Sequence, residues 1–282
     1  MTTPPLSDSG AAAEGRPSPP PASTRSGDIR VHESFASRFL EAHRSVRVYL
    51  PPGYEADRER RYPVLYLQDG QNLFDNATAF GGREWGVDEA AERLVAEGVI
   101  EPLIVVGVDN AGDQRIAEYT PSRDDEQGAG GAADQYGWML FDELKPMIDA
   151  TYRTRPEQEH TALGGSSLGG LVSLYLALRH GGKVGRAAIL SPSVWWDDQE
   201  IVRRVRDAEG RPALRLWLSV GTAEGEEHVA NARALRDTLV AKGWSLDRDF
   251  RYAEYQGAEH REEAWGRQIA EALGFLFPVA SG

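Results

Sequence analysis

The stretch LGGSSLGGLVSLYLALRH, residues 163–180, places two adjacent serines between two pairs of glycines. The residues that lead into it (HTALG, 160–164) have the pattern of a buried strand, and those that follow (LVSLYLALRH, 171–180) are apolar at helical spacing. A sharp turn from strand to helix needs glycines, because a Cβ atom would collide with the tightly folded backbone. The stretch therefore predicts a strand, a tight turn and a helix, in that order.

Strand and helix patterns alternate on both sides of this turn. Strand patterns occupy residues 45–54, 62–70, 102–110, 187–193, 215–225 and 249–260. Helical patterns occupy residues 85–98, 133–152 with a bend at Pro146, 197–208, 226–242 and a last segment to about Leu276. This alternation is typical of an α/β fold with a mostly parallel central sheet and helices on both faces. We expect one such domain over residues 29–282, with ligands at the carboxyl ends of its strands.

Composition limits the classes of partner. The chain has 282 residues, a formal net charge of -13 and no cysteine. Disulfides and thiolate chemistry are excluded, and the acidic surface argues against binding to nucleic acid or to anionic lipid. No apolar run reaches the roughly 18 residues that a membrane-spanning helix needs. The oligomeric state is left open.

The N-terminal residues 1–28 are rich in Pro, Ser and Ala. Such a composition buries too little apolar surface to offset the entropy of ordering, so we expect a disordered tail. It lacks the basic start and the continuous apolar segment of a secretory signal. A cytoplasmic location is therefore the expectation.

Ser167, rather than Ser166, has the surroundings of a nucleophile. Gly165 and Gly169 lie two residues before and two residues after it, whereas Ser166 has Leu168 where the second glycine is needed. Ser167 would stand at the N-terminus of a helix. There the backbone N–H of Leu168 has no partner within the helix and is available to an oxyanion.

A serine nucleophile needs a base, and the chain has six histidines. His260 follows the last strand pattern and precedes the last helix, which is the position of the general base in an α/β-hydrolase. The other histidines are interpreted as surface residues: His32, His43, His160, His180 and His228.

The triad acid should lie between the serine and this histidine, after the preceding strand. The segment SVGTAEGEEH supplies Glu224, Glu226 and Glu227. Glu224 is favoured because it lies in the loop itself. The other two are explained equally well as favourable charges in the first turn of the next helix.

Seven motifs together resemble one family. They are VYLPPGY, RYPVLYLQDGQNLFD, EYTP, GGSSLGG, SPSVWW, SVGTAEG and GAEHREEAW, spread from Arg47 to Trp265. On these motifs the chain resembles the esterase family of the α/β-hydrolase fold. That family includes esterase D, enterochelin esterases, feruloyl and acetylxylan esterases, and mycobacterial mycolyltransferases.

The resemblance implies that Ser167 is the nucleophile, His260 the base and Glu224 the acid, where many relatives have aspartate. It also implies that the backbone N–H of Gln71, in the turn QDGQN, is the second oxyanion donor beside that of Leu168. Many relatives have a His-Gly-Gly version of this turn, and here it contains Asp69-Gly70.

Substrate-binding side chains are expected in the other loops at the same sheet edge. The candidates are Trp85, Arg115, Tyr119, Trp195 and Trp196. Any one of the tryptophans could instead belong to the core. Arg115 could receive an anionic catecholate, as basic residues do in siderophore esterases, or form an ion pair with Glu118 or Asp113. No metal and no cofactor are expected, because triad chemistry needs neither.

The predicted reaction is hydrolysis of a carboxylic ester through an acyl-enzyme. A siderophore-type lactone or another small intracellular ester is the expected substrate. The alternative is a carbohydrate esterase acting on feruloyl or acetyl groups. An alternative of another class is a non-catalytic binding module that retains the fold.

Overall fold

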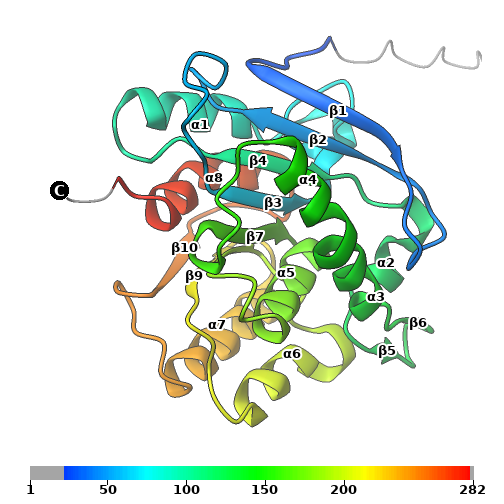
Figure 1. Ribbon diagram of the computed structural model, residues 1–282. Coiled ribbons are helices and arrows are strands. Elements are labelled where there is room, and N and C mark those ends of the chain that lie inside the picture. Colours follow the sequence, from blue (N-terminus) through cyan, green and yellow to red (C-terminus); the bar gives the residue numbers. More distant parts are fainter. Residues whose placement is uncertain (1–21, 280–282) are drawn as a thin grey trace, which may run out of the picture.

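The computed structural model describes residues 22–279, and its centre is an eight-stranded sheet (Figure 1). The strand order is β1-β2-β4-β3-β7-β8-β9-β10. β2 is antiparallel to its neighbours β1 and β4, and the remaining pairs are parallel. The strands are β1 (Asp28–Phe35), β2 (Arg44–Leu50), β3 (Val64–Gln68), β4 (Ile104–Val108), β7 (Thr161–Ser166), β8 (Arg186–Leu190), β9 (Arg215–Gly221) and β10 (Phe250–Tyr255).

Helices cover both faces of the sheet (Figure 1). They are α1 (Val87–Ala96), α2 (Arg115–Glu118), α3 (Ala133–Trp138), α4 (Lys145–Thr151), α5 (Leu168–Arg179), α6 (Trp196–Asp207), α7 (Glu226–Ala241) and α8 (Glu262–Leu276). The apolar sides of α1 and α8 pack against one face, and those of α3 to α7 pack against the other. The predicted fold, a mostly parallel sheet between two helical layers, is confirmed.

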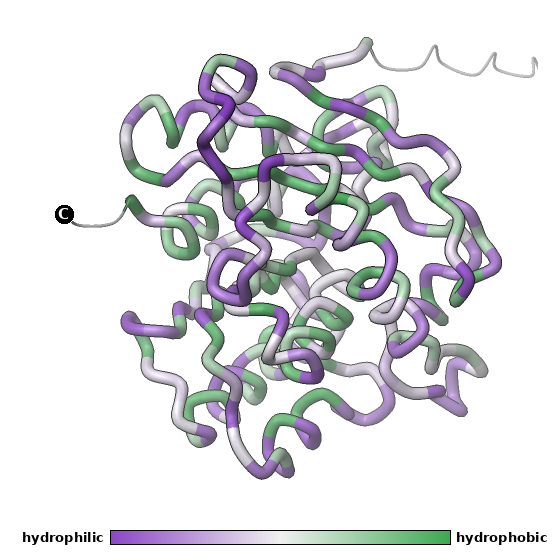
Figure 2. The backbone as a smooth tube through the Cα atoms, in the orientation of Figure 1, coloured by the Kyte–Doolittle hydropathy of each residue, from purple (hydrophilic) through white to green (hydrophobic). Residues whose placement is uncertain are grey.

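The central strands are apolar on both sides because both of their faces are covered. In β3, Val64 and Tyr66 belong to one core, and Leu65 and Leu67 belong to the other. Figure 2 shows hydrophobic residues concentrated in the interior, while hydrophilic residues dominate the outer loops. This is why short, nearly continuous apolar runs bounded by turn residues predicted these strands.

An edge strand, a hairpin and a π-helical segment differ from the sequence expectation. β1 adds an antiparallel edge strand that the N-terminal pattern did not reveal. Within the Gly/Asp-rich loop 122–131, β5 (Arg123–Asp124) and β6 (Ala129–Gly130) form a small hairpin. The helix predicted over 133–152 contains a π-helical segment, Met139–Leu144, directly before Pro146, whose missing N–H cannot continue the regular ladder.

Part of the predicted N-terminal tail contacts the domain. Residues 1–21 lie outside the described residues, and strand β1 already begins at Asp28. Ser23 Oγ donates to Asp75 at 2.8 Å, and the Ser26 N–H donates to Asp88 at 3.0 Å. Within residues 22–279, no helix has the length and apolar character needed to cross a bilayer.

The parallel strands bring several loops to one edge of the sheet. These loops follow the carboxyl ends of β3, β4, β7, β8, β9 and β10. They contain the residues singled out from the sequence, from Gln71 after β3 to His260 after β10.

Candidate active site

The turn after β7 has a strained backbone at Ser167. Its φ is 56° and its ψ is -125°, between the end of β7 at Ser166 and the start of α5 at Leu168. Such a conformation costs about 1–3 kcal/mol and is typical of functional turns. A Cβ atom on Gly165 would lie 2.8 Å from the carbonyl carbon of Gly169, so the framing glycines are required sterically.

Ser167 and His260 are in hydrogen-bond contact. The Nε2 atom of His260 lies 3.0 Å from Ser167 Oγ, and its Nδ1 atom lies 2.7 Å from Glu224 Oε2. The loop after β10 contributes the histidine, and the loop after β9 contributes the glutamate. These two contacts are the geometry that a serine nucleophile, a general base and an orienting acid require.

Glu224 is held by further donors on its other oxygen. Oε1 accepts hydrogen bonds from Ser191 Oγ at 2.6 Å and from the Gly221 N–H at 2.7 Å. Burial alone would raise the pKa of Glu224, but the hydrogen bonds from His260, Ser191 and Gly221 outweigh it and lower the pKa. The carboxylate is therefore ionised beside His260 at neutral pH.

Glu226 and Glu227, the alternative acids, lie in the exposed first turn of α7. Their carboxylates stabilise the helix N-terminus electrostatically. The structure thus brings Glu224 to His260.

Two backbone N–H groups lie in the turns that surround Ser167. The N–H of Leu168 opens α5, and that of Gln71 lies in the turn after β3; neither has a hydrogen-bond acceptor within residues 22–279. Gln71 and Ser167 line the same cavity. Both N–H groups are available to an oxyanion.

Residues 37–276 match the model of a family described as "Putative esterase". The chain belongs to this family. The carboxylic ester hydrolase activity predicted from the motifs is confirmed by this family membership.

The esterase chain also resembles individual proteins. An endo-1,4-beta-xylanase/feruloyl esterase of Xylanibacter ruminicola is 31% identical over 86% of this chain and 31% of the relative. An iron(III) salmochelin esterase of Escherichia coli is 26% identical over 83% of this chain and 54% of the relative. The chain therefore spans only part of either relative. The crystal structure of BES protein from Bacillus cereus has the same fold, with a TM-score of 0.73 and 21% identity over 90% of this chain and 96% of that one.

Two cavities of the esterase meet at Ser167 and His260. The first, of about 430 Å³, is lined by Trp195, Trp196, Ile116 and Ser193. The second, of about 340 Å³, is lined by polar residues that include Asp69, Asn110, Arg115 and Glu262. The space beside Ser167 and His260 therefore has one side with exposed tryptophan and another with mostly polar side chains.

The predicted substrate-binding aromatic residues divide into two groups. Trp195, which is 38% exposed, and Trp196 both line the first cavity. Trp85 lies in the core instead, with its ring centroid 6.0 Å from that of Trp265. Tyr119 is also in the core, where its hydroxyl accepts a hydrogen bond from the Asp69 N–H at 3.3 Å. Neither core residue lines the two cavities, because the turn after β3 covers Tyr119 and helix α8 covers Trp85.

Arg115 lines the second cavity, but its charge is compensated. Its guanidinium binds Asp69 at two points, 2.7 and 2.8 Å, and Asn110 Nδ2 donates to the same carboxylate at 2.7 Å. The ion pair thus forms with Asp69, and the sequence-based candidates Glu118 and Asp113 are not its partners; Glu118 binds Arg44.

Sequence reasoning missed three side chains beside the triad. Ser193 Oγ lies 3.3 Å from Ser167 Oγ, and His228 Nε2 lies 3.2 Å from Glu224 Oε2. Glu262 lies at the start of α8, and burial raises the pKa of its carboxyl. The Glu-x-x-x-His spacing of Glu224 and His228 is the one signal that could have drawn attention to the second histidine.

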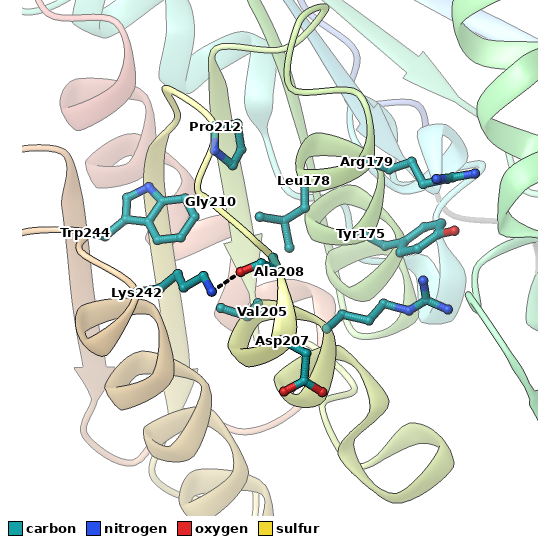
Figure 3. A pocket seen from close by; sticks show the side chains of 11 residues that line it. Tyr175, Leu178, Arg179, Val205, Asp207, Ala208, Gly210, Pro212, Lys242 and Trp244 are labelled. Atoms are coloured by element: carbon teal, nitrogen blue, oxygen red, sulfur yellow. Dashed lines mark hydrogen bonds between the residues drawn. The ribbon is translucent and has the colours of Figure 1, made fainter.

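Another cavity, of about 330 Å³, is lined by residues outside the triad (Figure 3). Trp244 and Lys242 lie on one side of it, and Tyr175 and Arg179 lie on the other. The Lys242 ammonium donates to the carbonyl of Ala208, and Arg179 pairs with Asp134 at 3.1 Å. These charges are already partnered, and no nucleophile–base pair lines this cavity, so the cavities at Ser167 remain the candidate active site.

Proposed function

We propose that the protein hydrolyses esters with a Ser167–His260–Glu224 triad through an acyl-enzyme. The observation that carries this proposal is the continuous hydrogen-bonded contact from Ser167 Oγ to His260 Nε2 and from His260 Nδ1 to Glu224. A binding module that only retained the fold would not need this contact. This hydrogen-bonded arrangement of Ser167, His260 and Glu224 therefore favours catalysis over binding alone.

In the proposed mechanism, Ser167 Oγ attacks the ester carbonyl carbon while its proton moves to His260 Nε2. The N–H groups of Leu168 and Gln71 hold the tetrahedral oxyanion. The intermediate collapses, and His260 gives the proton to the leaving alcohol. A water molecule then loses its proton to His260 and attacks the acyl-enzyme, which releases the acid and restores Ser167.

Glu224 would act through His260. Its negative charge stabilises the imidazolium that forms in each proton transfer and keeps the Nδ1–H directed away from the serine. Because Ser191 and Gly221 hold the other oxygen, the carboxylate is already oriented before substrate binds.

A siderophore-type lactone or another small ester is the proposed substrate. The similarity to an iron(III) salmochelin esterase supports this class. An acyl ester on carbohydrate is the second candidate, supported by the similarity to a feruloyl esterase. One observation favours the second candidate: Asp69 compensates Arg115, so this guanidinium offers no free charge to an anionic catecholate. The exposed ring of Trp195 would pack against either an aromatic acyl group or a sugar.

The first test is hydrolysis of p-nitrophenyl acetate and butyrate by wild type and by Ser167→Ala. We expect activity in the wild type and a fall in kcat on the order of 10⁶ in the variant. A catechol trilactone, methyl ferulate and acetylated sugars then separate the substrate classes. Activity that persists in Ser167→Ala, or a wild type inert toward every ester of this series, would refute the proposed function.

A further inference from the structure

We propose that Glu224, His228 and His260 form an inhibitory zinc site that overlaps the triad. Each of the three residues offers one ligand atom, and these atoms all lie within 4.8 Å of one another. Two histidines and one glutamate are a set that binds Zn²⁺ in metalloenzymes, with a further position left for water. The inhibition rests on the proposed catalytic function, whereas the binding of zinc does not.

Two of the three distances between ligand atoms are close to those of a tetrahedral zinc site, and all three atoms lie within 4.8 Å of one another. Zinc–nitrogen and zinc–oxygen bonds of about 2.0–2.2 Å place neighbouring ligand atoms roughly 3.3 Å apart. His228 Nε2 already lies 3.2 Å from Glu224 Oε2. His260 Nδ1 lies 2.7 Å from the same oxygen, so this pair must separate by about half an ångström. A rotation of the partly exposed His260 ring can supply this movement.

The ion can reach the site from solvent. The side chains of His228 and His260 are 14% and 34% exposed, and both line the cavity that contains Trp195. A neighbouring cavity of about 510 Å³ opens onto Glu224 and His228 from the side of α7. Glu226 and Glu227 line this second opening and give it a negative charge that attracts cations.

The other metal-binding side chains of the described residues compete poorly with this site for zinc. The sequence has no cysteine, so no thiolate competes for the ion. A second group, Glu84, Asp88 and Glu89, contains carboxylates alone. Carboxylate oxygens suit calcium and magnesium, whereas imidazole nitrogen suits zinc.

Zinc binding would move protons within the two imidazole rings. In the proposed resting enzyme, His260 carries its proton on Nδ1 and donates it to Glu224. Zinc takes the lone pair of that nitrogen, so the proton of the neutral ring must lie on Nε2, which faces Ser167 Oγ at 3.0 Å. In His228 the proton moves from Nε2, which lies 3.3 Å from the Ser191 carbonyl oxygen, to Nδ1. In the zinc-bound form each ring carries its proton on the nitrogen that the metal does not bind.

Bound zinc would prevent His260 from acting as the general base. A His260 ring that carries its proton on Nε2 cannot accept the proton of Ser167. The metal would lie on the Glu224 side of the ring, away from the ester carbonyl. Zinc should therefore lower kcat and leave KM nearly unchanged.

The binding test uses untagged, chelator-treated Ser167→Ala, which keeps all three ligands. Isothermal titration with zinc chloride should show one zinc per chain whose affinity falls at least about tenfold when His228→Gln is added. His43→Gln in the same background is the matched control, because it makes the same change at an exposed histidine. Equal zinc affinity in the His228→Gln and His43→Gln backgrounds, or no binding at all, would overturn the site.

The activity test compares p-nitrophenyl butyrate hydrolysis with and without zinc in wild type, His228→Gln and His43→Gln. Each variant is normalised to its own zinc-free rate. We expect wild type and His43→Gln to lose kcat at unchanged KM and to recover with a chelator, and His228→Gln to need at least about tenfold more zinc. Zinc that binds without lowering kcat would overturn the inhibition. A wild type without esterase activity would refute the proposed function alone, since the titration still decides the site.

Discussion

The sequence alone left open which of three glutamates, Glu224, Glu226 or Glu227, is the triad acid. The structure distinguishes Glu224 from the other two by contact, because its carboxylate lies between His260, Ser191 and Gly221. Those donors also explain why its pKa is lowered in spite of burial. Its charge and its contacts should therefore affect both kcat/KM and the dependence of the unfolding free energy on pH.

Glu224→Gln should reduce kcat/KM by about 10²–10⁴, because a neutral amide stabilises the imidazolium poorly and no longer fixes the histidine tautomer. Glu226→Gln, the same chemical change two residues away, should alter kcat/KM less than about threefold. The comparison is made with p-nitrophenyl butyrate at neutral pH. A larger loss in Glu226→Gln than in Glu224→Gln would show that Glu226, and not Glu224, is the triad acid.

The lowered pKa of Glu224 predicts how stability depends on pH. The folded protein holds this carboxyl at a pKa below its ordinary value of 4.5, so unfolding takes up a proton between the two pKa values. The ionised carboxylate therefore contributes stability above about pH 4.5, and this contribution is lost as the pH falls through the folded pKa. Urea unfolding at pH 7 and pH 4 should show a greater loss of unfolding free energy in wild type than in Glu224→Gln. Parallel losses in the two proteins would contradict the role of the hydrogen bonds.

At the scale of an element, the turn between β7 and α5 works because two glycines allow its backbone to fold tightly. The strain at Ser167 is tolerated because β7 and α5 are packed into the core on either side of it. A side chain inserted here has no space, since the nearest atoms to a Cβ on Gly165 belong to the backbone of Gly169.

Gly165→Ala should destabilise the fold by about 1–3 kcal/mol and, by displacing Ser167, reduce kcat on the order of 10²-fold. Gly182→Ala is the matched control, because a Cβ at that position meets no atom within 4 Å. Thermal unfolding and p-nitrophenyl butyrate hydrolysis measure the two effects. Full activity in Gly165→Ala would mean that the turn can relax without moving the nucleophile.

At the scale of the whole molecule, residues that precede the first strand form hydrogen bonds with the segments around α1. Ser23 and Ser26 donate to Asp75 and Asp88, which come from the segments around α1. Asp88 is fully buried, and burial raises the pKa of its carboxyl to about 8, so its oxygen atoms depend on such hydrogen-bond donors.

Deletion of residues 1–27 should lower Tm by roughly 4–8 °C relative to deletion of residues 1–21, because about 2 kcal/mol of hydrogen bonding is removed. Activity should change little in either protein, since the triad loops lie at the ends of other strands. Differential scanning fluorimetry measures the difference between the two deletions. An identical Tm would show that these contacts add nothing to stability.

The sequence by itself determined the α/β class, the place of most strands and helices, and the roles expected of Ser167 and His260. These follow from local causes: two-sided burial makes the central strands continuously apolar, and a tight turn requires glycines around its serine. The edge strand β1 was not predicted because its residues are mostly exposed and their alternation of apolar and polar residues is weak. Tertiary structure alone decided that Trp85 and Tyr119 belong to the core, that Asp69 compensates Arg115, and that His228 lies against Glu224. Each of these depends on which side chains separate strands and loops bring together, and spacing along the chain does not encode such contacts.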